Sequence, residues 1–257
     1  ILVLMKIIIS PAKSLNFQKE LPTNEFSMPL FLDDSISINK TLKLKSTLQL
    51  KSLMSISDKL ADLNWQRNND FKTPFDVKNA RPAIFTFDGD VYTGLDAFTL
   101  NENKINKAQE SLRILSGLYG FLRPLDLMQP YRLEMGTKLE LKNSSNLYEF
   151  WKEKITKKLN NELIENELFV NLASKEYSSA IDPKKLITKM VSPIFKDFKN
   201  GNLKIISIYA KKARGMMVRY ILDNEVNNEQ DLKGFNYGGY SFNIEETQTS
   251  KELVFIR

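Results

Sequence analysis

The stretch 115–136 (LSGLYGFLRPLDLMQPYRLEMG) constrains the fold of this chain more than any other segment. It contains three of the ten glycines and two of the nine prolines, and it follows a long helical pattern. Glycine permits backbone conformations that other residues resist, and proline ends helices. A segment this irregular and this apolar is poorly suited to a solvated linker. The sequence therefore predicts a fixed turn here, which either serves function or redirects the chain.

The composition excludes several classes of catalytic and metal-binding site. Among its 257 residues the chain has no cysteine and no histidine. These absences exclude disulfides, thiol nucleophiles, histidine bases and most transition-metal sites. We expect no cofactor and no metal site. The chain carries 37 cations against 31 anions, a formal charge of +6, which favours polyanionic partners wherever the cations cluster.

The sequence predicts a mixed α/β (α+β) fold, a single compact domain over 5–257 with a mixed sheet flanked by helices. The apolar opening is interrupted by Lys6 and has no preceding cationic region, so it reads as a buried strand rather than a signal peptide. With no apolar run of about 18 residues, we expect a cytoplasmic protein without a membrane partner.

The hydrophobic pattern predicts the following elements. The predicted strands are 5–9, 83–87, 168–172, 189–198, 203–209, 235–243 and 252–257. The predicted helices are two within 34–66, then 103–116, 146–165 and 228–233.

Polar side chains follow two of the predicted strands directly. Ser10 and Lys13 come after strand 5–9, and Asp88-Gly89-Asp90 comes after strand 83–87. In open α/β sheets ligands bind at such strand ends. The alternatives are a plain strand exit with a solvated lysine and a structural turn. Two aspartates around one glycine also suit a hard cation, but further ligands at regular spacing are missing.

Four cations within nine residues open a predicted helix after strand 203–209. They are Lys211, Lys212, Arg214 and Arg219. A helix N-terminus attracts anions and disfavours cations, so this clustering predicts an anion site, the alternative being a solvated basic face. Helical spacing places Lys212 with Arg219 on one face, and Lys211 with Arg214 on a neighbouring one. Arg123 and Arg132 would extend this surface if the central stretch folds beside it, and for Lys59 a solvated helix face is the favoured reading.

Together these motifs resemble the YaaA family of bacterial proteins. They are SPAKSL at 10–15, ISDKLA at 56–61, GDVYTGL at 89–95, the stretch 115–136, NLAS at 171–174 and IISIYAKKARG at 205–215. The family pattern begins with a methionine that matches Met5, so Ile1–Leu4 resemble an extension. The resemblance implies a cytoplasmic protein of the peroxide-stress response, associated with limiting free iron and with protecting DNA from oxidation. It also implies a mixed α/β fold specific to the family, with a basic cleft and a helix-hairpin-helix-like element that bind duplex or branched DNA.

The helix-hairpin-helix expectation maps onto the central stretch in part. Helix 103–116 and the turn Gly117–Gly120 would supply its first helix and its phosphate-binding backbone, with Tyr119 or Tyr131 stacking on a base. Pro124 and Pro130 leave little room for a regular second helix, so that helix is either short and irregular or elsewhere.

Three functional hypotheses follow. The first is a non-enzymatic DNA-binding protein of low sequence specificity, contacting phosphates through Lys13, the 211–219 cations and the Gly117–Gly120 backbone. The second is an enzyme for a nucleotide or other small anion, with supporting Ser10, an acid or base among Asp90, Asp126, Glu134 and Tyr209, and Lys13 or Lys212 stabilising charge. The third, direct metal sequestration, is weakest because no ferritin-like glutamate pattern occurs. The sequence does not fix the oligomeric state, for which a monomer is favoured.

Overall fold

The strand β1 (Met5–Ile9) is the centre of the fold, and all five of its residues are buried. In the computed structural model, which describes residues 5–249 and 251–257, β1 lies between β5 (Leu112–Ser116) and β8 (Leu168–Leu172). It pairs in parallel with both neighbours. A continuous run of isoleucines suits this place, because a parallel strand covered on both faces needs no polar side.

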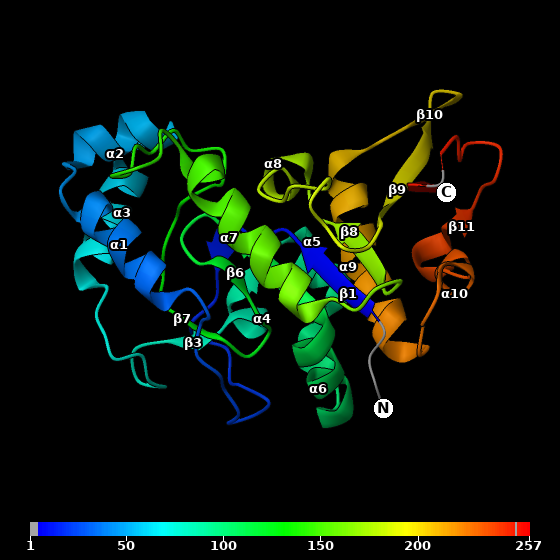
Figure 1. The fold of residues 1–257 in the computed structure, drawn as a ribbon, viewed down its shortest axis with the longest axis horizontal. Helices are drawn as coiled ribbons and strands as arrows, with labels where there is room; N and C mark the ends of the chain where they lie inside the picture. The colour runs from blue at the N-terminus through cyan, green and yellow to red at the C-terminus, as the bar shows by residue number, and fades with distance from the viewer. Residues whose placement is uncertain (1–4, 250) are drawn as a thin grey trace.

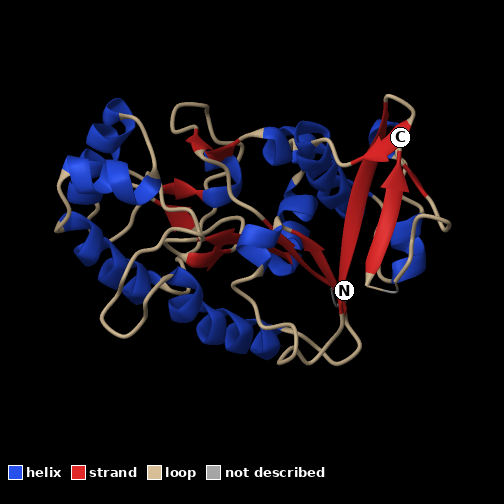
Figure 2. Ribbon diagram, turned by 90° about the horizontal axis from the view of Figure 1, so that it is seen from above, coloured by secondary structure: helices blue, strands red, loops and turns tan. Residues whose placement is uncertain are grey.

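The remaining strands extend the sheet on both sides of this centre. Its order is β11-β12-β9-β8-β1-β5-β6, with β10 paired to β9. The additional bounds are β6 (Gly120–Leu122), β9 (Met190–Lys199), β10 (Asn202–Lys204), β11 (Ser241–Phe242) and β12 (Glu252–Ile256). From β12 to β5 the neighbours run in parallel, while β6, β10 and β11 pair antiparallel. Figure 2 shows β9 and β12 side by side at one end of the molecule.

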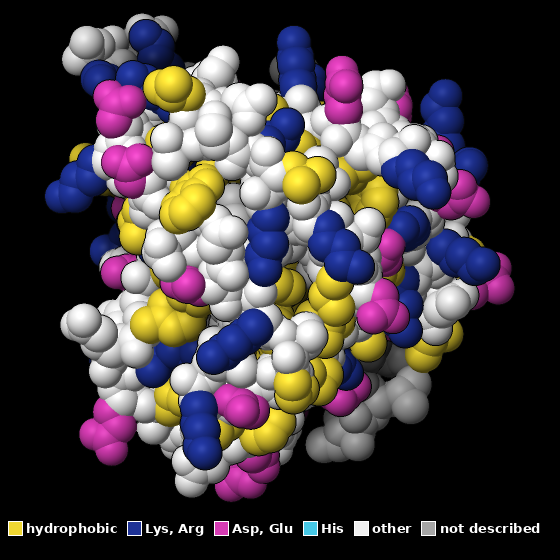
Figure 3. Space-filling view, turned by 90° about the vertical axis from the view of Figure 1, so that its left-hand side faces the viewer, with side chains coloured by type: hydrophobic (Ala, Val, Ile, Leu, Met, Phe, Trp, Pro, Cys, Tyr) yellow, Lys and Arg dark blue, Asp and Glu magenta, His cyan; other side chains and the backbone are white. Residues whose placement is uncertain are grey.

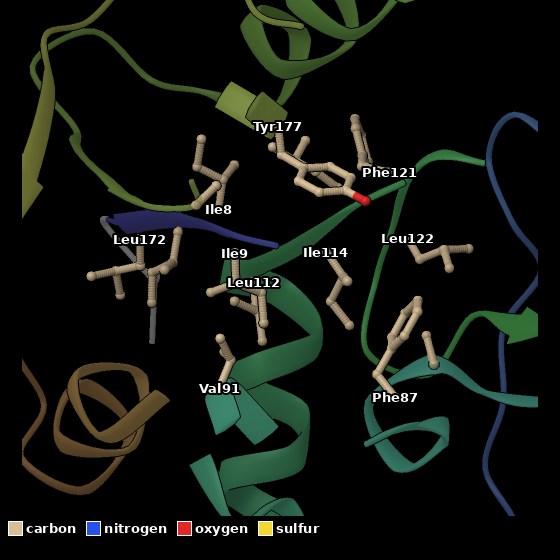
Figure 4. Close-up of a cluster of buried hydrophobic side chains, with 14 of the residues drawn as sticks. Ile8, Ile9, Phe87, Val91, Leu112, Ile114, Phe121, Leu122, Leu172 and Tyr177 are labelled. Atoms are coloured by element: carbon tan, nitrogen blue, oxygen red, sulfur yellow. The ribbon is translucent and has the colours of Figure 1, made fainter. Parts of the chain in front are cut away.

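Helices cover both faces of the sheet. Figure 4 shows Tyr177 on one side of β1 and β5, and Val91 on the other. The first side carries α7 (Leu147–Glu162) and α8 (Lys175–Ser178); the second carries α5 (Asp90–Leu95), α6 (Glu102–Ser111) and α9 (Ser207–Asp223). The stripe of α7 is buried as its spacing predicts, with Trp151, Ile155 and Leu159 fully enclosed.

A helical lobe lies at the opposite end of the molecule from β9 and β12 (Figure 1). It consists of α1 (Leu32–Lys43), α2 (Thr47–Met54) and α3 (Asp58–Asp70), so the region holds three helices rather than the predicted two. Ser46 and Ser57 accept hydrogen bonds from the first turns of α2 and α3. These serine caps mark the extra break in the helical pattern.

Short elements join these layers. They are β2 (Ser14–Leu15) paired with β4 (Phe87–Asp88), β3 (Arg81–Pro82) paired with β7 (Leu127–Met128), α4 (Ala83–Thr86), α10 (Glu229–Lys233) and the 3-10 turns Ala97–Thr99 and Tyr237–Gly239.

Two predicted elements are wrong in type. Residues 83–86 form the single turn of α4 and only Phe87 belongs to a strand, β4, because a short buried apolar run does not distinguish the two. The predicted helix 103–116 ends at Ser111 and continues as β5. There Leu112 and Ile114 pair with Ile7 and Ile9, and burial within the sheet overrides the helical spacing.

The last predicted strand before the cations, 203–209, is also mostly wrong. Its β10 portion ends at Lys204, and α9 already begins at Ser207. The cation cluster therefore starts one turn inside the helix rather than at its N-terminus.

The mixed α/β fold itself is confirmed. The predicted extension Ile1–Leu4 lies outside the described residues. Across the described part of the chain, no helix combines the length and apolarity needed to cross a membrane.

Candidate functional site

A pocket of about 410 Å³ lies at the carboxyl ends of β1 and β8. From β1 the chain crosses to β5 on one side, whereas from β8 it continues to β9 on the other. The two strands therefore form the point at which the sheet's connections change direction. Ligands bind at this position in open α/β sheets, because the diverging connections leave a crevice there. Its lining residues are Ser10–Ser14, Asp88–Tyr92, Glu134, Ser174, Glu176, Tyr177, Lys211 and Arg214.

Hydrogen bonds join the two strand ends that form the floor. Ser10 Oγ accepts a hydrogen bond from the Ser174 backbone N–H at 2.9 Å, and the two hydroxyls lie 3.4 Å apart. The Tyr92 hydroxyl donates to the Ser10 carbonyl at 3.2 Å. The loops after β1 and β8 are thus held to each other and to α5, which gives the pocket a fixed base.

Two glycines bring α5 and α9 together at one wall. A Cβ on Gly94 would lie 2.1 Å from the Lys212 carbonyl oxygen, and one on Gly215 would lie 1.8 Å from the Val91 carbonyl oxygen. Only glycine allows so close an approach of two helix backbones. This crossing places Asp90 and Arg214, from segments far apart in sequence, at the same pocket.

The pocket carries charges of both signs. Its cations are Lys13, Lys211 and Arg214; its carboxylates are Asp88, Asp90, Glu134 and Glu176. Lys13 Nζ lies 3.2 Å from Glu134 Oε1, although the lysine side chain is 67% exposed. Glu176 Oε1 accepts a hydrogen bond from the Gly136 N–H at 3.0 Å. Such a mixture exceeds what phosphate binding needs and suits proton transfer beside charge stabilisation.

Arg214 stands out among these groups. Its side chain is partly buried, and this burial lowers the pKa of the guanidinium. Among the described residues no carboxylate lies within ion-pair distance of it, and no protein acceptor receives a hydrogen bond from it. A desolvated cation without a counter-ion is costly unless an anion completes it.

Two buried tyrosines complete the lining. Burial raises the pKa of Tyr92 well above its usual value, with smaller contributions from Tyr131 and Tyr177. Burial also raises the pKa of Tyr177, reinforced by Tyr131 and nearby carboxylates. Both phenols therefore keep their protons near neutral pH and do not act as bases.

The pocket unites five of the predicted site residues: Ser10, Lys13, Asp90, Lys211 and Arg214. It also includes Glu134. Lys212 and Arg219 instead line a separate groove, as their spacing on α9 indicates. There the Arg219 guanidinium bonds to both carboxylate oxygens of Asp223, at 3.0 and 3.1 Å, and to Thr99 Oγ1 at 2.6 Å.

The predicted contacts of the Gly117–Gly120 turn are wrong. Gly117, Tyr119 and Gly120 are buried, and the segment connects two strands, β5 and β6, rather than two helices. The Gly117 carbonyl accepts a hydrogen bond from Trp151 Nε1 at 2.9 Å, and a Cβ at Gly120 would meet the same indole ring at 2.8 Å. Tyr131 is likewise buried, so neither tyrosine is available to stack on a base.

Other predicted residues have structural partners or lie elsewhere. Arg123 pairs with the fully buried Asp126 at 2.9 Å, which removes both from the pocket. Lys59 is exposed on α3 and does not line it. Tyr209 lies outside it as well, 46% exposed beneath the Arg257 guanidinium.

Sequence reasoning assigned no role to Ser174, Glu176 or Tyr177. The signal was available, because these residues lie within five residues of the end of β8, much as Ser10 and Lys13 lie within four residues of the end of β1. The part of the chain that the structure describes offers no comparable cluster of side chains for a metal ion. Within 5–249 and 251–257, no three Asp or Glu side chains gather to hold an ion.

Comparison with known sequences identifies the family of this chain. The family model described as "Peroxide stress protein YaaA" matches residues 5–246. This chain belongs to the YaaA family. A UPF0246 protein of Flavobacterium johnsoniae is 60% identical over 98% of this chain and 100% of its own length. Similar proteins of Flavobacterium psychrophilum and Aliivibrio fischeri are 57% and 52% identical, each over 98% of this chain, covering 100% and 98% of their own lengths. The family description supports a role in peroxide stress.

Proposed function

We propose that this YaaA family protein acts in peroxide stress by binding a small anionic ligand, such as a nucleotide, in the pocket at the ends of β1 and β8. The observation that carries the proposal is Arg214, a partly buried guanidinium without a carboxylate partner among the described residues. A phosphate or carboxylate group of the ligand would supply the missing charge.

The proposal extends to catalysis on that ligand. Asp90 lies in the same pocket as the cations and forms no ion pair among the described residues, so its carboxylate can move a proton while Lys211 and Arg214 stabilise developing charge. Asp126 is excluded from this role because it is fully buried against Arg123.

Calorimetry with inorganic phosphate and a nucleotide panel tests the binding. We expect Arg214→Met to weaken binding about 10- to 100-fold, since a hydrogen bond to a charged group contributes about 1.5–3 kcal/mol. Lys59→Met is the matched control, because it removes one positive charge on exposed α3 outside the pocket. Equal binding by both variants would contradict the proposal.

Binding to DNA is a second proposal, supported by the +6 charge and by exposed lysines around the pocket and its neighbouring groove. Lys13, Lys211 and Lys212 would contact phosphates without reading bases. By covering DNA, such a protein would limit its oxidation by free iron. The face over α1–α3 favours this role less, because its cations alternate with acidic and apolar side chains (Figure 3).

A salt series with a labelled duplex and a branched junction tests the second proposal. We expect Lys211→Glu/Lys212→Glu to abolish binding and Lys40→Glu/Lys59→Glu, of equal net charge, to lower it far less. Log affinity should fall linearly with log salt. Equal loss in both variants would indicate only a general charge effect.

A further inference from the structure

Glu134 occupies a place between two cations. Its Oε1 atom lies 3.2 Å from Lys13 Nζ and 3.0 Å from Arg132 Nη2. Both contacts use the same oxygen. The glutamate thus presents one anionic oxygen to a lysine at the pocket and to an arginine behind it.

The arginine behind Glu134 has a buried donor that Glu134 does not satisfy. Arg132 Nε is buried and has no hydrogen-bond acceptor among the described residues. Arg67 on α3 lies close enough that burial and the charge of Arg132 together lower its pKa.

Two arginines close together repel one another unless an anion lies between them or beside them. One carboxylate oxygen serves both Lys13 and Arg132, and the charge of Arg67 lies close to Arg132 without a carboxylate of its own among the described residues. This pairing leaves the buried Nε–H of Arg132 without a partner in the described chain, and this donor has lost its hydration without gaining a hydrogen bond. The arrangement is consistent with a place for a larger anion that offers more oxygens.

We propose that Glu134 is an internal counter-ion occupying an anion subsite between Lys13 and Arg132, and that the ligand carries two linked anionic groups. One group would bind at Arg214, and the other would displace the Glu134 carboxylate. This inference rests on the proposed function of the pocket and deepens it. The ligand class is a polyanion with adjacent phosphoryl groups, such as a nucleoside diphosphate or triphosphate.

The displacement has a simple electrostatic reason. A terminal phosphoryl group has up to two charges and three oxygens, which can accept from Lys13 and Arg132 together. While Glu134 stays in place it repels that group, so the glutamate lowers affinity for polyanions. An anion with a single group at Arg214 does not enter the Lys13–Arg132 subsite and avoids most of this cost.

Calorimetry with inorganic phosphate and tripolyphosphate on the full chain tests the inference. We expect Glu134→Gln to bind tripolyphosphate about 10-fold more tightly, since removal of a nearby like charge shifts such equilibria by about one log unit. Its phosphate affinity should change less than 3-fold. Glu140→Gln, an exposed glutamate on the same loop, is the matched control and should change neither.

Arg132→Met gives the complementary result, with tripolyphosphate binding weakened about 10-fold and phosphate binding nearly unchanged. Because this variant keeps Glu134, it tests the subsite even if Glu134→Gln unfolds. Unchanged or weaker tripolyphosphate binding in a folded Glu134→Gln protein would overturn the inference. If Arg214→Met still weakened phosphate binding, the proposed function would survive that failure. If the wild-type protein did not bind phosphate, the proposed function would be wrong, and this inference with it.

Discussion

The helix α9 carries two arginines, five residues apart, in opposite situations. Arg219 is satisfied by Asp223, Thr99 and a backbone carbonyl. Arg214 lies in the pocket, and its charge is unmatched by any carboxylate in the described chain. Both belong to the same run of cations in the sequence, and only the tertiary partners separate them.

This difference separates structural charge from functional charge. A guanidinium held by a carboxylate and a hydroxyl stabilises the fold and has little capacity left for a ligand. A guanidinium that is desolvated and unpaired lowers the stability of the fold, and such groups are usually found in binding sites. Clustering of cations is therefore a weaker guide to function than the pairing of each one.

The largest expected effect comes from breaking the helix crossing that both arginines depend on. Gly215→Ala places a Cβ against the Val91 carbonyl oxygen, a backbone atom that has no freedom to move aside. We expect the free energy of unfolding to fall by about 3 kcal/mol, at the upper end of overpacking effects. Urea unfolding at pH 7 measures it.

Gly201→Ala is the control for this substitution. Gly201 has open space around its Cβ position but a positive φ of 76°. Only the backbone cost of about 1 kcal/mol is expected there. If the two variants lost equal stability, the close approach of α5 and α9 would not be what constrains Gly215.

The sequence identified the centre of the fold well and the segments around it unevenly. The strand 5–9 and helix 146–165 were predictable because their apolar patterns are regular, a continuous run in the strand and an i+4 stripe in the helix. The segment 103–116 was not, because Ile105, Ala108 and Leu112 keep helical spacing across the point where the helix becomes β5. Pairing with β1 decides this change, and strand pairing is a long-range property.

The candidate site was predictable from strand ends and not from glycines. Ser10 and Lys13 follow a strand of the main sheet, and the rule for open sheets places them at the pocket. Asp90 also lines the pocket, but the segment before it is α4 and the two-residue β4, which lie outside the main sheet. Gly117 and Gly120 were predicted to form a phosphate-binding turn. In the structure Gly120 instead makes room for the Trp151 ring, and Gly117 makes room for neighbouring backbone. A glycine needed for close packing and a glycine needed for a ligand look the same in one sequence.

A second prediction contrasts the two arginines directly through stability. Arg219→Met should lower the free energy of unfolding by about 1–2 kcal/mol, because it leaves Asp223 and Thr99 without their partner. Arg214→Met should leave it unchanged or slightly higher, because an unpaired charge is removed from a partly buried place. Thermal and urea unfolding of both variants measure the contrast. Equal losses would show that Arg214 also has a structural role.

The smallest expected effect is the acid dependence contributed by Asp223. Although burial opposes it, hydrogen bonds from Lys104, Arg219 and Tyr237 lower the pKa of this carboxyl below its ordinary value of 3.8. A folded-state pKa below the unfolded one means that the ionised group stabilises the fold above pH 3.8, and that this contribution is lost as pH falls through the folded pKa. Asp223→Asn should therefore flatten the stability curve between about pH 4 and pH 2, as followed by urea unfolding.

Asp58→Asn, at an exposed ion pair with Lys51, is the control and should leave the acid limb of the stability curve unchanged. A wild-type slope retained in Asp223→Asn would mean that the pairing around Arg219 is not what distinguishes it from Arg214.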